Sequence, residues 1–333
     1  MKKYKVYGMG AALVDTEIKV EDRELGQMSV EKGMMTLVDQ SRQSELLGHL
    51  EGHLVKASHA SGGSAGNSMI ATAQFGGPTF MSCKVANDAD GDIYVADLES
   101  AGVDHCLVNG RADGTTGKCL VLITPDAERS MNTFLGISET LSVDELDHSA
   151  IADSEYLYVE GYLVTSPTGR AAAVRARVVA EAAGVKTSLS LSDPGMVEFF
   201  RDGLAEMLGA GVDLVFCNEE EALGWGDTKD LEAAIAALKG IARNFVITRG
   251  SQGALAYDGN ELHEIPPHRV QAVDSNGAGD MFAGAFLYAI TRGEDFPTAG
   301  RFASLAAGKI VANYGPRLTA EAYPQLRAEF FGD

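Results

Sequence analysis

The chain has 333 residues and a formal net charge of −20, with 45% hydrophobic and 22% charged residues. This length excludes a small disulfide-stapled module, and no apolar run approaches the roughly 20 residues that span a bilayer. The negative charge repels phosphate backbones and anionic lipid, so we expect neither nucleic acid nor a membrane as a partner.

The cysteines and the amino end indicate the compartment. The four cysteines contain no C-x-x-C pair, which fits reduced thiols better than disulfides or zinc ligands. The amino-terminal segment MKKYKVYGMG lacks the small-residue cleavage site of a secretory signal. We therefore expect a cytoplasmic protein.

Two segments of the first half, 15–39 and 118–136, alternate β-branched and polar residues. Such alternation is typical of half-exposed strands. We predict that these distant segments pair into a small β-sheet, a lid, that covers one edge of a larger domain.

Between these segments lies SGGSAGN (61–67), directly before a helix-like stretch, 68–74. Paired glycines let a ligand approach the backbone closely, and the Asn67 amide can donate to and accept from a diol at once. This pattern fits a polyol site, although a flexible turn explains the segment alone equally well.

The second half alternates short apolar runs with alanine-rich helical segments. The runs 156–159, 185–191, 212–217 and 245–248 are typical of buried strands, and 168–183 and 230–242 have helical spacing. This alternation predicts an α/β fold with a doubly wound, mostly parallel sheet.

One of these predicted strands ends in CNEEE (217–221), at the edge where open α/β sheets bind ligands. Asn218 and Glu221 are suited to magnesium held through water, because this ion keeps much of its hydration. An amino-terminal helix cap with an acidic first turn is an equally good interpretation.

The strongest motif is DSNGAGD (274–280), which directly precedes the apolar helix MFAGAFLYAI. Consecutive amides from Asn276 to Gly279 at a helix amino end form an anion site. An aspartate beside them, Asp280, can take a proton from an attacking hydroxyl while the amides hold the charge of a transferred phosphoryl group. Taken alone, a glycine-rich helix start capped by Asp280 is the simpler interpretation.

These three motifs, in this order, resemble the signatures of the PfkB, or ribokinase-like, carbohydrate kinase family. DSNGAGD matches D-T-x-G-A-G-D except for serine in place of threonine, SGGSAGN corresponds to the G-G signature, and 218–221 match N-x-x-E. The similarity extends from Gly8 to about Arg317 and is greatest to the adenosine kinase branch, through GMGAALVD, ERSMNTFLGIS and LSLSDPGMVEFF.

The resemblance implies a ribokinase-like fold with helices on both faces of the central sheet. The large α/β domain would comprise residues 1–13, 40–114 and 137–333, and the β lid residues 14–39 and 115–136. The implied activity is transfer of a phosphoryl group from ATP to the 5′-hydroxyl of adenosine.

The resemblance also implies a role for each matched residue. Asp280 would be the base that deprotonates the acceptor hydroxyl. The anion hole and the contact with the transferring phosphate would come from Asn276, Gly277, Ala278, Gly279 and Arg129. The acceptor sugar would be bound by Asp15, Gly62, Gly63 and Asn67. Arg129 as a solvated strand charge is the alternative.

The base and the nucleotide would be bound by further segments. Tyr162, or its neighbour Leu163, would lie against the base. An apolar roof over a purine is expected from residues that alternate on two lid strands: Met35, Leu37, Met131, Thr133 and Leu135. Packing of the lid is the alternative for each of them. ATP contacts are expected from Asn218, Thr248, Gly250 and Gly253, with Mg²⁺ at Asn218 and Glu221 through water and a monovalent cation such as K⁺ near Asp274 and Ser275.

One position departs from the adenosine branch, which usually has asparagine where this chain has Ala11. Either a water replaces the lost amide or the acceptor differs. A sugar kinase acting on ribose, fructose or a sugar acid, and a nucleoside-binding protein without turnover, are therefore alternatives. A monomer and a homodimer are both compatible with the lid pattern.

Overall fold

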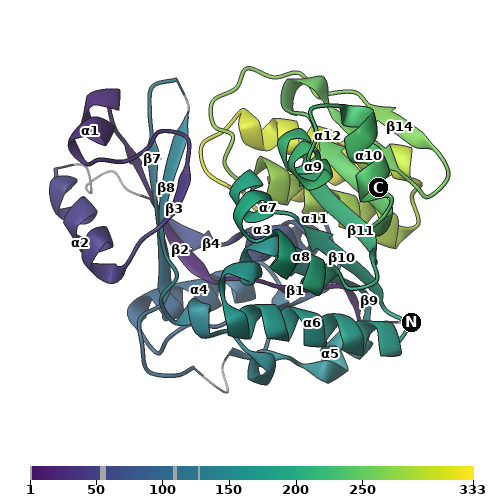
Figure 1. Cartoon of the computed structure of the whole chain (residues 1–333), viewed down its shortest axis with the longest axis horizontal. Coiled ribbons are helices and arrows are strands. Elements are labelled where there is room, and N and C mark those ends of the chain that lie inside the picture. Colours follow the sequence, from purple (N-terminus) through teal and green to yellow (C-terminus); the bar gives the residue numbers. More distant parts are fainter. Residues whose placement is uncertain (1, 53–57, 108–110, 127) are drawn as a thin grey trace.

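The computed structural model describes residues 2–52, 58–107, 111–126 and 128–333 (Figure 1). Its main element is a nine-stranded sheet, in which the strands from β12 to β6 are parallel and β13 and β14 form an antiparallel edge. The strand order is β14 (Leu262–Ile265), β13 (Ala254–Tyr257), β12 (Ala242–Thr248), β11 (Val212–Asn218), β10 (Lys186–Ser190), β9 (Ser154–Glu160), β1 (Tyr4–Met9), β5 (Thr79–Ser82) and β6 (Val103–His105). The four runs predicted in the second half correspond to β9, β10, β11 and β12.

Helices cover both faces of this sheet, because its strands are apolar on both sides. On β9, Tyr156 and Tyr158 contribute to one buried cluster, whereas Leu157 and Val159 contribute to the other. The first cluster is completed by α3 (Ser64–Gln74), α4 (Ala89–Ser100), α11 (Ala278–Arg292), α12 (Phe296–Val311) and α13 (Ala322–Phe331). The second is completed by α5 (His148–Ala152), α6 (Pro167–Ala182), α7 (Pro194–Phe199), α8 (Arg201–Leu208), α9 (Glu219–Gly226) and α10 (Leu231–Leu238).

A second, five-stranded sheet stands at the side of the large one (Figure 1). Its order is β3 (Met35–Leu37), β8 (Arg129–Phe134), β7 (Gly117–Ile123), β2 (Leu13–Lys19) and β4 (Ser58–Gly62). The strand β2 pairs with β7, and β3 pairs with β8. The prediction that 15–39 and 118–136 pair into a small sheet is confirmed, as is the α/β fold class with helices on both faces.

The small sheet contains more of the chain than the sequence indicates. Residues 15–39 are not all extended, because α1 (Asp22–Gln27) begins there with a capping box at Glu21. Together with α2 (Gln40–His49), α1 packs its apolar side chains on the outer face of the sheet (Figure 1). We propose that 40–52 and 58–62, assigned above to the large domain, belong to the lid, since α2 packs on the small sheet and β4 pairs with β2.

Short 3-10 turns connect several elements: η3 (Gly136–Thr140), η4 (Val143–Glu145), η5 (Gly161–Thr165) and η6 (Gly250–Gln252). All four cysteines are free thiols. Within the described ranges, no helix is long and apolar enough to cross a membrane.

Candidate active site

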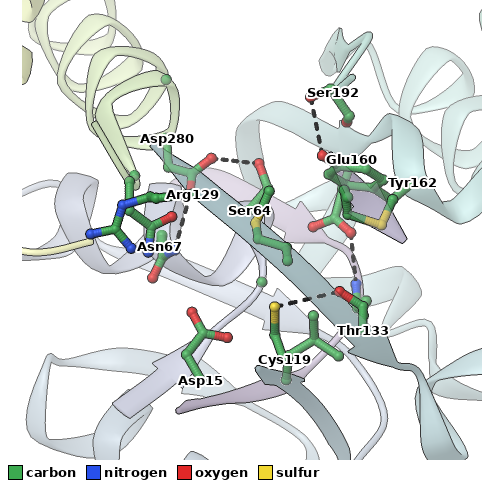
Figure 2. A pocket seen from close by; sticks show the side chains of 18 of the residues that line it. Asp15, Ser64, Asn67, Cys119, Arg129, Thr133, Glu160, Tyr162, Ser192 and Asp280 are labelled. Carbon is green, nitrogen blue, oxygen red and sulfur yellow. Dashed lines mark hydrogen bonds between the residues drawn. The ribbon is translucent and has the colours of Figure 1, made fainter. Parts of the chain in front are cut away.

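A cavity of about 380 Å³, here called the inter-sheet cavity, lies between the small sheet and the carboxyl ends of β1 and β9 (Figure 2). Open α/β sheets bind ligands at this edge. The residues from the sequence analysis that line it are Ala11, Asp15, Met35, Leu37, Gly63, Asn67, Arg129, Met131, Thr133, Leu135, Tyr162, Ser275, Asn276, Gly277, Gly279 and Asp280.

Asp280 lies in the first turn of α11, and both of its carboxylate oxygens accept hydrogen bonds from α3. The Ser64 hydroxyl donates to Oδ1 at 2.6 Å, and the Asn67 amide donates to Oδ2 at 2.9 Å. Burial raises the pKa of Asp280, and the hydrogen bonds from Ser64 and Asn67 oppose this shift. The carboxylate is thereby held in one orientation at the cavity wall (Figure 2).

Asn67 has a free acceptor atom as well. Its Oδ1 is buried and has no hydrogen-bond partner among the described residues. A buried polar atom without a partner is costly, and a ligand hydroxyl would satisfy it. The geometry therefore fits the diol expected at this position, with the amide group on Asp280 and the oxygen left for the ligand.

The loop before α11 presents backbone amides at the helix amino end. Gly277 is the N-cap with φ 71°, and a Cβ at this position would lie 2.5 Å from the Pro316 carbonyl oxygen. Two of the four expected outward-facing donors bond within the loop: the Asn276 amide donates to Asp274 Oδ1 at 2.8 Å, and the Ala278 amide donates to the Ser275 carbonyl oxygen at 3.3 Å. The amides of Gly277 and Gly279 are left at the helix start, where anions bind.

Arg129 connects the small sheet to this loop. It is only 8% exposed and forms ion pairs with Asp274 and with Glu17, the latter at 3.3 Å. Burial lowers the pKa of Arg129, and Glu17 opposes this shift. Such burial is incompatible with a solvated strand charge, and it places a cation on the cavity wall beside the helix start.

Asp15 is the acidic group of the small sheet in this cavity. Burial and the nearby Glu17 raise the pKa of Asp15 to about 7. Gly62 is not a lining residue, but a Cβ there would lie 2.1 Å from Asp15 Oδ1, so only glycine leaves room for the carboxylate. Gly63 has φ 85°, and a Cβ there would lie 2.2 Å from the Ala11 carbonyl oxygen.

The part of the cavity wall that β3 and β8 form is mostly apolar. The strands β3 and β8 pair with Met35 opposite Met131 and Leu37 opposite Thr133, so these side chains line one surface together with Leu135. The Thr133 hydroxyl donates to Cys119 Sγ at 3.4 Å, and Tyr162 in η5 donates to the Ser192 carbonyl at 3.3 Å (Figure 2).

The cavity also contains polar residues that have no predicted role: Ser64, Glu128, Glu160, Thr165 and Ser192. Glu160 is 1% exposed at the end of β9 and accepts the Ala65 amide at 2.8 Å and the Ala11 amide at 3.2 Å. Burial raises the pKa of Glu160 to about 7. Glu160 ends an apolar strand in the sequence, as Asn218 does, and this position could have identified it as a candidate.

A neighbouring cavity of about 680 Å³ lies on the other side of the loop before α11. It is lined by Thr248, Gly250, Gly253 and Ala278 from the sequence analysis. Ser275 and Gly279 line both cavities. The amides at the helix start are therefore placed between two spaces large enough for small ligands.

Asn218 and Glu221 line neither cavity. They form a capping box at the start of α9, in which the Asn218 amide group donates to Glu221 Oε1 at 2.7 Å and Asn218 Oδ1 accepts the Glu221 amide at 2.7 Å. Burial raises the pKa of Glu221 to about 8. Among the described residues, no group of three or more His, Cys, Asp or Glu is arranged to hold a metal ion. The geometry is that of the helix cap, and it leaves only a water-mediated role towards Mg²⁺.

Comparison with known proteins identifies the family. Residues 29–322 match the pfkB family carbohydrate kinase. An adenosine kinase structure from Sinorhizobium meliloti is 33% identical, with a TM-score of 0.91, over 97% of this chain and 99% of that one. A probable sugar kinase from Rhizobium etli CFN 42 is 32% identical, with a TM-score of 0.91, over 98% and 99%. The adenosine kinase of Saccharomyces cerevisiae is 27% identical over 94% of this chain and 96% of that protein.

The family match spans most of the chain and includes the loop before α11 and the lining residues of both cavities except Ala11, Leu13 and Asp15. The chain belongs to the pfkB family of carbohydrate kinases and is an ATP-dependent kinase that phosphorylates a hydroxyl group.

Proposed function

We propose that the chain phosphorylates the 5′-hydroxyl of adenosine with ATP. The observation that carries this proposal is the placement of Asp280 and the loop before α11 between two cavities. The inter-sheet cavity combines polar groups for a sugar with an apolar wall for a base, and it holds the acceptor. The neighbouring cavity holds ATP. The similarity to adenosine kinases supports the choice of acceptor.

The transfer is a direct in-line displacement. Asp280 accepts the proton of the acceptor hydroxyl as the oxygen attacks the γ-phosphorus, the bond to the bridging oxygen breaks, and ADP leaves. The amides of Gly277 and Gly279 stabilise the charge on the transferred group, with Arg129 beside them. Asn218 and Glu221 would hold the waters of a Mg²⁺ ion bound to ATP, and this ion would neutralise phosphate charge.

The acceptor is oriented by its sugar and its base. Asp15 and Asn67 Oδ1 bind the ribose hydroxyls, with Gly63 providing the close approach. Met35, Leu37, Met131, Thr133 and Leu135 cover the purine, and Tyr162 packs against it. Thr248, Gly250 and Gly253 contact the nucleotide of ATP. A monovalent cation such as K⁺ near Asp274 and Ser275 is part of the same proposal.

A sugar kinase is the second candidate. Glu160 adds a second buried carboxylate to the cavity beside Ala11, and this favours an acceptor richer in hydroxyl groups than a purine nucleoside. The similarity to the probable sugar kinase from R. etli points the same way.

The test is ADP release from ATP and Mg²⁺ with a panel of acceptors: adenosine, inosine, guanosine, cytidine, ribose, fructose and 2-keto-3-deoxygluconate. Turnover confined to adenosine is the expected result. Turnover on a free sugar alone contradicts the substrate assignment but keeps the mechanism. Adenosine binding by calorimetry without turnover on any acceptor indicates a binding protein instead.

The substitution Asp280→Asn tests the base. We expect kcat to fall by roughly 10²–10⁴-fold, because the amide cannot accept the proton. Adenosine binding, measured by calorimetry, should change little. A variant with full turnover rules out Asp280 as the base.

A further inference from the structure

Ser64 occupies an unusual position for a serine at the start of a helix. It is the first residue of α3, and its hydroxyl caps none of the free amides there. It donates instead to Asp280 Oδ1 at 2.6 Å, across a sequence separation of 216 residues. A local capping role therefore does not explain this side chain.

The backbone on both sides of Ser64 is fixed. The preceding Gly63 has φ 85° and packs against the Ala11 carbonyl, where a Cβ would lie 2.2 Å away. The following Ala65 donates its amide to Glu160 at 2.8 Å. The Ser64 hydroxyl is thus held in place against α11 before any ligand enters, and Ser64 itself lines the inter-sheet cavity (Figure 2).

The hydrogen bonds leave Asp280 able to react. Each carboxylate oxygen has two acceptor positions, and the described residues fill one on Oδ1, from Ser64, and one on Oδ2, from Asn67. The remaining positions are left for the proton of the acceptor hydroxyl. Hydrogen bonds donated to a carboxylate also favour its ionised form, which is the form that a base requires.

We propose that Ser64 is a positioning residue for the phosphoryl transfer, which orients the Asp280 carboxylate and keeps it ionised for the acceptor hydroxyl. This inference rests on the proposed function, in which Asp280 is the base. Serine is suited to the task because its short side chain has a single donor, and fixing it costs little conformational entropy.

Other charged groups also act on Asp280, and the test leaves them in place. The titratable and charged groups that face it are Asp15 and Arg129 from the small sheet and Glu160, Tyr158 and Tyr162 from the large domain. The two carboxylates disfavour a charge on Asp280. Among the described residues, only Ser64 donates a hydrogen bond to Asp280 Oδ1, so its loss leaves this oxygen without a donor.

The experiment compares kcat and KM for adenosine between pH 5.5 and 9 in the wild type and in Ser64→Ala. The expected result is a loss of kcat/KM of roughly tenfold at acid pH that shrinks as the pH rises, since a larger share of Asp280 is protonated when the hydrogen bond is missing. The loss should fall on kcat more than on KM. If Ser64→Ala folds poorly, Ser64→Cys provides the same test, because it nearly keeps the side-chain volume and should show the same loss.

Two controls separate positioning from packing. Ser64→Thr keeps the hydroxyl and should retain the wild-type kcat/KM at acid pH, here called the acid limb of the pH profile. Ser68→Ala removes the hydroxyl one turn later in α3, which donates to the Asp280 main-chain oxygen at 3.1 Å, and should leave the acid limb in place. In an Asp280→Asn background, Ser64→Ala should cause no further loss, because the two residues act as a unit.

The outcomes distinguish this inference from the proposed function. If the wild type turns over adenosine and Asp280→Asn is inactive, but the Ser64→Ala acid limb matches the wild type, Ser64 does not position the base. A rise in KM alone overturns the inference too, because Ser64 then only binds the acceptor. If the wild type itself has no turnover on any acceptor, the proposed function fails, and the role of Ser64 fails with it.

Discussion

Two glycines of the loop before α11, Gly277 and Gly279, meet different surroundings although only one residue separates them. Gly277 needs a positive φ and lies against Pro316, so its lack of a side chain serves the backbone. Gly279 has no heavy atom within 4 Å of a hypothetical Cβ, apart from its own helix and chain neighbours, and lines both cavities. Its lack of a side chain leaves space for the ligand.

This difference predicts opposite effects of alanine at the two positions. Gly277→Ala should lower the free energy of unfolding by about 1–3 kcal/mol, because alanine is strained at this φ. Gly279→Ala should leave the melting temperature unchanged or slightly higher, since alanine favours a helix. The kcat of Gly279→Ala should still fall roughly tenfold or more, because the added methyl group displaces the reacting groups. Thermal melting and ADP release measure both effects, and full activity of Gly279→Ala would show that the phosphoryl group does not pass this point.

Several site residues were predictable because a local motif contains them. The segments 61–67 and 274–280 each place glycines beside polar residues at a helix start, and this arrangement is local in sequence. Ser64 and Glu160 were not found, since their contacts join segments that only the packing of α3 brings together. Arg129 was assigned from the family resemblance, but its ion pair with Asp274, which joins β8 to the loop before α11, was not predicted.

At the scale of elements, continuous apolar runs identified β9 to β12, because parallel strands are buried on both faces. The first half was harder to predict. The helix α1 has six residues and one buried side chain, Leu25, so its periodicity is too short to distinguish from a strand. The short strand β3 gains its position from pairing with β8 rather than from its own pattern.

The strands β3 and β8 form the part of the small sheet that should respond to the acceptor. We expect hydrogen exchange of their amides to slow when adenosine binds, because their side chains then close over a ligand and water is excluded. The strands β10 and β11 provide an internal control and should exchange at the same rate in both states. Equal exchange in residues 15–39 with and without adenosine would contradict closure of the lid.

At the scale of the whole molecule, burial keeps three carboxyl groups from ionising easily. The pKa is raised to about 7 for Asp15 and Glu160 and to about 8 for Glu221, with burial as the largest cause. Above its unfolded value, from about pH 4 upward, each group binds more protons in the folded state than in the unfolded state. The contribution of these groups to stability is therefore fully present below about pH 4 and is lost as the pH rises to the folded-state values.

The substitution Asp15→Asn tests this pH dependence, because Asp15 accepts no hydrogen bond from the described residues that the substitution would remove. We expect its melting temperature without ligand to exceed that of the wild type by roughly 2–5 °C at pH 8, and we expect this difference to shrink as the pH falls and to vanish near pH 4. Asp113→Asn removes the same charge from an exposed position and should show no such pH-dependent difference. Parallel pH profiles for the wild type and Asp15→Asn would show that Asp15 titrates normally.

The strand order also determines how the protein behaves at high concentration. The large sheet ends in β14, with four residues, and β6, with three, and the small sheet ends in β3, with three, and β4, with five. Short edge strands present few unpaired backbone groups to a neighbouring molecule. The two sheets therefore offer a neighbouring molecule little backbone with which to pair. The net charge of −20 adds repulsion between copies, and both features oppose aggregation.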